Sequence, residues 1–184
     1  LFLSERSSFI KGKAIRGGIP IIFPWFGART ANTCDPRSDG PAHGFARTSD
    51  WQLVSSSMTG DHLTLSLALN ANEVSQALGF EQFQVNYNLT IGSELELQLT
   101  VKNCSDRKLC FAEALHTYFL VADSEKITIE GLAGNEYYDK TDITVADITD
   151  PAFQQWLKEL MGAVTDLTIG SYSVESLALF GYST

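Results

Sequence analysis

Strict alternation of apolar and polar residues is the feature that most constrains how this chain folds. In the stretch DHLTLSLALN, leucine occupies every second position from Leu63 to Leu69, and the residues between are small or polar. Successive side chains of a β-strand point to opposite faces, so a period of two is typical of a strand with one buried face. The stretch therefore predicts a half-buried strand.

The same alternation continues beyond this strand. Residues 83–103, FQVNYNLTIGSELELQLTVKN, place apolar residues at alternate positions on both sides of Gly92-Ser93, which predicts an antiparallel hairpin. Residues 109–121 and 126–134 also have strand composition. We therefore predict a single all-β domain over residues 1–184, with the architecture of an antiparallel β-sandwich.

Two segments break the pattern. ANEVSQAL, residues 71–78, predicts a short helix or a turn between strands. A further short helix is predicted near residues 151–161, with Asp150 as N-cap and Pro151 at the first helical position. Residues 166–184 return to strand composition, which indicates one or two final strands, or a tail without its partner.

Charge and composition exclude several classes of protein. Thirteen basic against twenty-two acidic residues give a net charge of −9, which disfavours binding to nucleic acid or anionic lipid. No apolar run is long enough to span a bilayer and the first residues lack the pattern of a signal peptide, so we expect a soluble, cytoplasmic protein. Cys34, Cys104 and Cys110 match no metal-binding spacing, and we expect reduced thiols without a catalytic role.

A few polar residues in apolar or turn-rich surroundings are candidates for chemistry. Arg16 precedes two glycines, which allow close approach of a ligand, and a guanidinium group suits phosphate or carboxylate. The alternative is an arginine that is solvated or paired with an acid. His43 and Arg47 lie in PAHGFAR, after the loop signal SDGP, so one loop can bring both to a ligand; the alternative for His43 is a hydrogen-bonded loop histidine.

His116 lies in a largely apolar predicted strand, EALHTYF. Imidazole titrates near neutral pH, so burial or neighbouring groups can tune this side chain for proton transfer. The alternative is a buried histidine bonded to a backbone carbonyl group. His62, at a strand start without polar companions, is expected to be structural or exposed.

Four segments in this order resemble the hexose-6-phosphate mutarotases, or glucose-6-phosphate 1-epimerases, of the aldose 1-epimerase superfamily. The segments are GKAIRGGIPIIFPWFG, PAHGFAR, EALHTYFLV and IEGLAGNEYYDK. The resemblance covers residues 1–140 and leaves 141–184 divergent. It implies the supersandwich fold of galactose mutarotase-like proteins and the interconversion of the α and β anomers of a hexose 6-phosphate, without a metal or other cofactor.

The resemblance also implies roles for individual residues. His116 is the general acid towards the ring oxygen, His43 binds the sugar, and Arg16 and Arg47 hold the 6-phosphate. The aromatic residues of the first segment, Phe23, Trp25 and Phe26, either wall the site or fill the core.

The family's general base is a glutamate near the C-terminus, after Asp-Arg and Asn-Pro-Trp patterns that do not appear beyond Lys140. Glu175 is the nearest candidate, and Glu113 and Asp139 are alternatives, although strand parity turns Glu113 away from His116. Two other interpretations therefore stay open: a non-catalytic domain that binds sugar phosphates, and a truncated, inactive family member. The sequence does not predict an oligomeric state.

Overall fold

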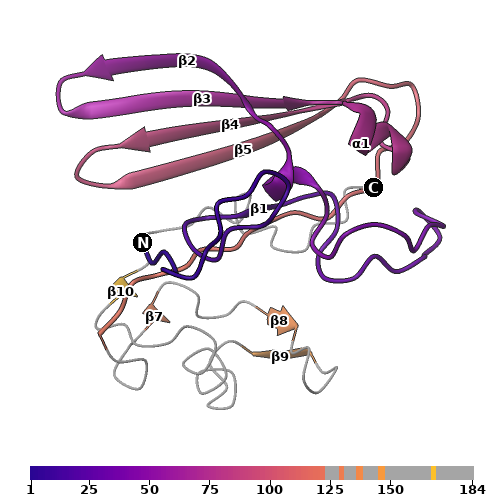
Figure 1. Ribbon diagram of the computed structural model, residues 1–184, viewed down its shortest axis with the longest axis horizontal. Helices are drawn as coiled ribbons and strands as arrows, with labels where there is room; N and C mark the ends of the chain where they lie inside the picture. The colour runs from indigo at the N-terminus through magenta and orange to yellow at the C-terminus, as the bar shows by residue number, and fades with distance from the viewer. Residues whose placement is uncertain (123–128, 131–135, 139–144, 148–166, 169–184) are drawn as a thin grey trace. The chain divides into compact units, whose positions relative to one another are not determined.

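The computed structural model describes residues 1–122, 129–130, 136–138, 145–147 and 167–168. The chain forms two compact units whose segments alternate along the sequence. Figure 1 labels α1 and the strands that are described below. Unit 1 comprises Leu1–Ser8, Ile15–Pro20 and His116–Leu177, and unit 2 comprises Phe9–Ala14, Ile21–Leu115 and Ala178–Thr184. The single-domain organisation stays a prediction.

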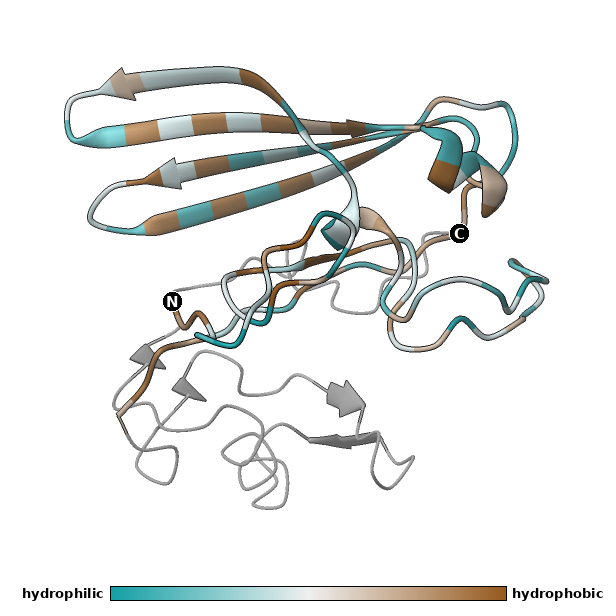
Figure 2. Ribbon diagram, viewed as in Figure 1, coloured by the Kyte–Doolittle hydropathy of each residue, from teal (hydrophilic) through white to brown (hydrophobic). Residues whose placement is uncertain are grey.

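A four-stranded antiparallel sheet is the largest element of unit 2. It contains β2 (Gln52–Thr59), β3 (His62–Asn70), β4 (Phe83–Ile91) and β5 (Leu95–Asn103), in that spatial order. The strand predicted from the leucine alternation and the hairpin that follows it are confirmed. Figure 2 shows the apolar and polar residues alternating along these strands.

The register of this sheet gathers its apolar side chains on one face. Tyr87 lies opposite Leu67 on one side and Leu99 on the other. Burial on this face changes along the strands: Val85 is fully buried, whereas Ile91 at the far end of β4 is 40% exposed. The sheet therefore packs on the core along only part of its length.

Phe23 lies at the centre of the core of unit 2. Its side chain is fully buried, and its ring lies 5.5–6.4 Å, between centroids, from four other phenylalanine rings. These are the rings of Phe45, Phe80, Phe83 and Phe111. Phe23 and Trp25 are thus core residues, whereas Phe26 is only partly buried.

Short elements surround this core. β1 (Ile21–Ile22) pairs antiparallel with β6 (Ala114–Leu115), and a 3-10 turn, η1, spans Ala46–Thr48. The helix or turn predicted in residues 71–78 is α1 (Glu73–Ala77). The Asn72 side chain accepts a hydrogen bond from the Ser75 amide at 3.0 Å, and the Ser75 hydroxyl accepts one from the Asn72 amide at 2.9 Å, which forms a capping box.

The described strands of unit 1 form two small ladders. β7 (Ile129–Glu130) pairs parallel with β10 (Leu167–Thr168), and β8 (Glu136–Tyr138) pairs antiparallel with β9 (Val145–Asp147). The helix predicted near residues 151–161 lies outside the described residues. Within the described ranges helical structure is limited to α1 and η1, and no helix is long and apolar enough to cross a membrane.

The oxidation state of two of the cysteines differs from the expectation. Cys34 and Cys110 form a disulfide with their Cα atoms 6.0 Å apart, and Cys104 is a free, exposed thiol. The expectation of three reduced thiols is therefore wrong. The two partners are 76 residues apart in sequence, and only the folded chain brings their loops together.

We expect Tyr87→Phe to leave the free energy of unfolding unchanged or to raise it by about 1 kcal/mol. The Tyr87 hydroxyl oxygen is buried without a hydrogen-bond partner among the described residues, and burial raises the pKa of this phenol to about 12. Tyr87→Ala, which also removes the ring, should lower the free energy of unfolding by about 3 kcal/mol. Urea denaturation measures both; a clear loss of stability in Tyr87→Phe would contradict the unpartnered hydroxyl.

Candidate active site

The loop that carries His43 and Arg47 is fixed by a close backbone crossing. The carbonyl oxygen of Phe23 accepts hydrogen bonds from the amides of Phe45 at 3.0 Å and Ala46 at 3.2 Å. A Cβ atom at Gly44 would collide with the same carbonyl group, and Gly44 has a φ of +69°. Only glycine satisfies both the positive φ and the close approach.

The ring of His43 is oriented by the backbone of Gly27. The Gly27 amide donates to Nδ1 of His43 at 3.2 Å, and the His43 amide donates to the Gly27 carbonyl oxygen at 2.7 Å. The edge of the imidazole packs on Phe26, with the ring centroids 4.9 Å apart. Because Nδ1 accepts a hydrogen bond, the proton of the neutral ring is on Nε2, which is therefore a donor.

Arg47 lies in η1 and is partly buried. Its Nη2 atom donates to the carbonyl oxygen of Ala42 at 2.9 Å, so the structure brings the guanidinium group back to the residue before His43. Within the part of the chain that the structure describes, no carboxylate pairs with Arg47. The guanidinium group of Arg47 is thus held at the backbone next to His43.

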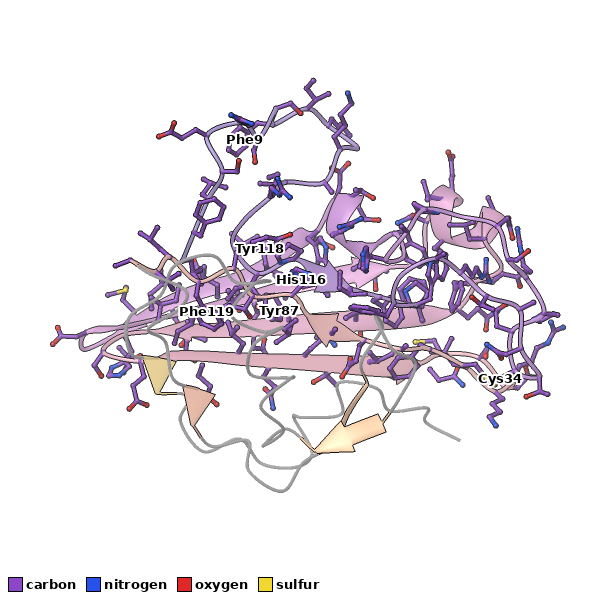
Figure 3. The ribbon with its side chains drawn as sticks, turned by 90° about the horizontal axis from the view of Figure 1, so that it is seen from below. Phe9, Cys34, Tyr87, His116, Tyr118 and Phe119 are labelled. Carbon is purple, nitrogen blue, oxygen red and sulfur yellow. A yellow bond between two sulfur atoms is a disulfide. The ribbon has the colours of Figure 1, made fainter. Side chains whose placement is uncertain are left out.

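His116 and Arg16 belong to unit 1. The His116 amide donates to the Pro20 carbonyl oxygen at 3.0 Å, and the Tyr118 amide donates to that of Gly18 at 2.9 Å. The two amides pair with alternate residues of the antiparallel segment, so the rings of His116 and Tyr118 lie on one face, 4.8 Å apart between centroids (Figure 3). His116 is partly buried.

Arg16 is exposed, and its guanidinium group has no hydrogen bond or ion pair with any described residue. Gly17, directly after it, is required by its contact with the N-terminal segment. A Cβ atom at Gly17 would lie 2.6 Å from both the Cα atom of Leu3 and the carbonyl oxygen of Phe2. The N-terminal segment therefore requires glycine at position 17, whereas Gly18 faces open space.

Of the three candidates for the general base, the structure describes one. Glu175 and Asp139 lie outside the described residues. Glu113 is described: Ala114 pairs with Ile22 and the Ala112 amide donates to Pro24, so Glu113 lies opposite Phe23 in the register and is partly buried. Burial raises the pKa of Glu113 above its ordinary value of 4.5, and its orientation away from His116 stays a prediction.

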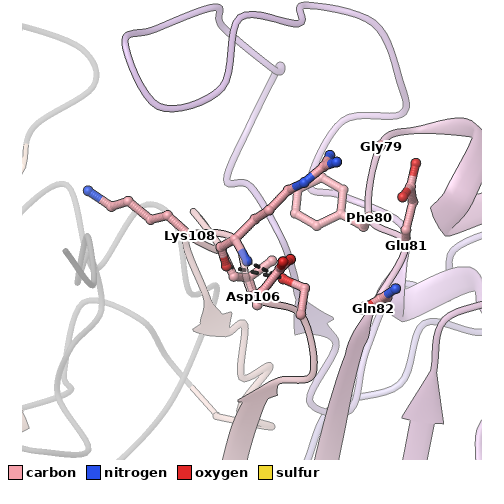
Figure 4. A pocket seen from close by; sticks show the side chains of 9 residues that line it. Gly79, Phe80, Glu81, Gln82, Asp106 and Lys108 are labelled. Atoms are coloured by element: carbon pink, nitrogen blue, oxygen red, sulfur yellow. Dashed lines mark hydrogen bonds between the residues drawn. The ribbon is translucent and has the colours of Figure 1, made fainter.

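One pocket outlined by described residues is lined by none of these candidates. Residues 79–82 and 105–109 line it, with a cavity volume of about 210 Å³ (Figure 4). Two acidic and two basic side chains line it, so its charge favours neither anions nor cations. Among the described residues, no cluster of histidine, cysteine and carboxylate side chains fits a metal ion.

Comparison with known proteins gives the family. The model of the aldose 1-epimerase family matches residues 3–164. The chain belongs to the aldose 1-epimerase family. It is 34% identical over 140 residues to the "Putative glucose-6-phosphate 1-epimerase" of Escherichia coli, a match that covers 76% of this chain and 44% of that protein. It is 30% identical over 148 residues to a protein of the same name from Cenchrus ciliaris, which covers 76% of this chain and 43% of the relative.

Solved structures agree with this membership of the aldose 1-epimerase family. The crystal structure of a "putative mutarotase (YeaD)" from Salmonella typhimurium superposes with a TM-score of 0.66 and 28% identity, and covers 81% of this chain and 47% of that one. The likeness confirms the predicted antiparallel β-sandwich of the galactose mutarotase type. The chain spans less than half the length of the relatives it matches.

The structural role of Arg29 was not predicted from the sequence. The guanidinium group, 2% exposed, donates from Nε and Nη2 to the carboxylate of Asp35 at 2.8 and 3.0 Å. It also donates to the carbonyl oxygens of Asp39 and Leu78 and lies 4.5 Å from the Trp25 ring centroid. A polar stretch with aspartates six and ten residues after an arginine was the only sequence signal.

We expect Arg29→Ala to lower the free energy of unfolding by about 3 kcal/mol, because it removes a buried charge and leaves Asp35 unpaired. Arg37→Ala is the matched control. Arg37 lies in the same loop but pairs with Asp39 at the surface, so its loss should leave the stability nearly unchanged. Urea denaturation measures both. Equal effects would contradict a stabilising role of the Arg29 bonds to Asp35, Asp39 and Leu78, which we call the Arg29 clamp.

We expect Glu113→Gln to be more stable than the wild type at pH 7. The folded-state pKa of Glu113 lies above its unfolded value, so the wild type loses stability as the pH rises through 4.5 towards the folded-state pKa. Glutamine does not titrate, and the difference should vanish well below pH 4.5. Denaturant titrations at several pH values measure it; a pH-independent difference would contradict burial of the ionised carboxylate as the cause.

Proposed function

We propose that this chain interconverts the α and β anomers of a hexose 6-phosphate such as glucose 6-phosphate. The observation that carries the proposal is the His43 loop, in which Arg47 offers a positive charge that no described carboxylate neutralises. Several relatives at 30–34% identity share the name of a glucose-6-phosphate 1-epimerase. Membership of an epimerase family supports sugar chemistry, and the charge supports a phosphorylated sugar.

Phosphate recognition would fall to Arg16 and Arg47. A guanidinium group presents several N–H donors in a plane and matches two phosphate oxygens at once. Neither arginine has to leave a carboxylate among the described residues in order to bind a phosphate. His43 would bind the sugar, because its Nε2–H donor is fixed by the hydrogen bond at Nδ1.

The chemistry requires one acid and one base. Ring opening of the cyclic hemiacetal removes the proton of the C1 hydroxyl group while the ring oxygen takes up a proton. Rotation about the C1–C2 bond then turns the aldehyde, and closure with the two roles reversed gives the other anomer. We assign the acid to His116 and the base to Glu175, and these proton transfers balance without a cofactor.

Replacement of His116 by alanine should lower protein-catalysed anomer exchange of glucose 6-phosphate at least 100-fold, because the ring oxygen loses its proton donor. Affinity for the sugar phosphate should change by less than about threefold, since the proposed phosphate ligands remain. Two-dimensional exchange NMR on the anomeric protons measures the rate, and calorimetry measures the affinity. His62→Ala, at an exposed histidine outside the proposed site, is the matched control; full activity of His116→Ala would contradict the assignment.

Replacement of Arg47 by alanine should remove the preference for glucose 6-phosphate over glucose in calorimetric titrations. The affinity for the phosphate should fall at least tenfold, because a charge-assisted contact is lost. Arg107→Ala serves as the control, since its exposed side chain makes no ion pair with described residues. Equal affinity of the wild type for both sugars would contradict phosphate recognition, and binding without exchange would indicate the non-catalytic binding domain.

A further inference from the structure

The segment of residues 30–40, which we call the strap, packs on the core only at its last residue, Gly40. None of its residues is buried. Its first turn is fixed by Asn32, whose side-chain oxygen accepts hydrogen bonds from the amides of Cys34 at 2.8 Å and Asp35 at 2.9 Å. Arg29, just before the strap, binds the Asp35 carboxylate. This turn presents Cys34 from a polar segment whose other anchors are the hydrogen bonds of Arg29 to Asp35 and Asp39.

The disulfide ties the tip of the strap to a second loop. Cys110 lies in the segment that joins β5 to β6, and its Cα atom is 6.0 Å from that of Cys34, within the usual range for a disulfide. Both residues are partly exposed, so small thiols and disulfides can reach them. Cys34 is labelled in Figure 3.

The strap leads directly into the loop of His43 and Arg47. At its end, Gly40 has a φ of +117° and packs so closely on Trp25 that a Cβ atom would lie 2.8 Å from the ring. The Trp25 Nε1–H group then donates to the carbonyl oxygen of Pro41 at 2.9 Å. An ordered strap therefore helps to fix the start of the loop that carries His43 and Arg47.

We propose that Cys34 and Cys110 are a reversible redox pair that orders the strap and, through it, the loop of His43 and Arg47. The part of this proposal that concerns sugar binding rests on the proposed function. The part that concerns the strap does not. Reduction removes the only covalent anchor of the strap within the described structure but leaves the aromatic core and the Arg29 clamp in place, so unit 2 stays folded.

The redox step needs a disulfide oxidant of low molecular weight, such as glutathione disulfide. The thiolate of one cysteine attacks a sulfur of the oxidant, which forms a mixed disulfide and releases one thiol. The thiolate of the other cysteine then attacks the protein sulfur and releases the second thiol. Two cysteines lose two electrons and two protons, and the oxidant gains them; a dithiol reverses the reaction.

The test compares the full chain after incubation with glutathione disulfide and after reduction with dithiothreitol. Hydrogen exchange with mass spectrometry should show amides of residues 32–40 exchanging at least tenfold faster in the reduced protein, with β3 and β4 unchanged. Cys34→Ser should match the reduced protein in both conditions. Cys104→Ser, which removes the free thiol, should match the wild type. Absence of a Cys34–Cys110 cross-linked peptide in the oxidised sample, or equal exchange in both states, would overturn the redox pair.

Calorimetry with glucose 6-phosphate tests the coupling to the loop. The reduced wild type and Cys34→Ser should bind at least threefold more weakly than the oxidised wild type. Equal affinity with a clear difference in strap exchange would overturn the coupling. If neither state binds the sugar phosphate, the proposed function fails and the coupling with it, and the hydrogen-exchange comparison still decides the redox pair by itself.

Discussion

The position of the loop that carries His43 and Arg47 depends on the hydrogen bonds that the Phe23 carbonyl oxygen accepts. This group accepts the amides of Phe45 and Ala46, while the ring of Phe23 is the centre of the aromatic core. Core and loop are therefore joined at one residue. Gly44 permits the crossing because it carries no Cβ atom, and the loop that holds His43 is thereby attached to the most deeply buried part of unit 2.

Polar anchors complete the support around this crossing. Gly27 fixes the imidazole of His43, and the buried guanidinium group of Arg29 links the next loop to the end of α1 through the Leu78 carbonyl oxygen. The Cys34–Cys110 disulfide adds a covalent anchor. Functional residues on loops need such support, because their positions are not set by a regular ladder of backbone hydrogen bonds.

Local patterns in the sequence predicted the parts of the fold that depend on neighbours in the chain. The leucine alternation predicted β3, and the apolar rows around Gly92-Ser93 predicted the β4–β5 hairpin. The disulfide joins residues 76 apart in sequence, and the Arg29 clamp includes the distant carbonyl oxygen of Leu78, so local patterns did not predict them. For the site, the motifs predicted that His43 and Arg47 share one loop, whereas they did not indicate that Gly17 is required by its close contact with Leu3.

The central claim, that the chain exchanges the anomers of a hexose 6-phosphate, is tested most directly with the unmodified protein. Two-dimensional exchange NMR on the α and β anomeric protons, with glucose 6-phosphate and glucose as parallel samples, measures the rate without a coupled enzyme. We expect cross-peaks that grow with protein concentration for the phosphate and not for glucose. Exchange that is independent of protein in both samples would contradict it.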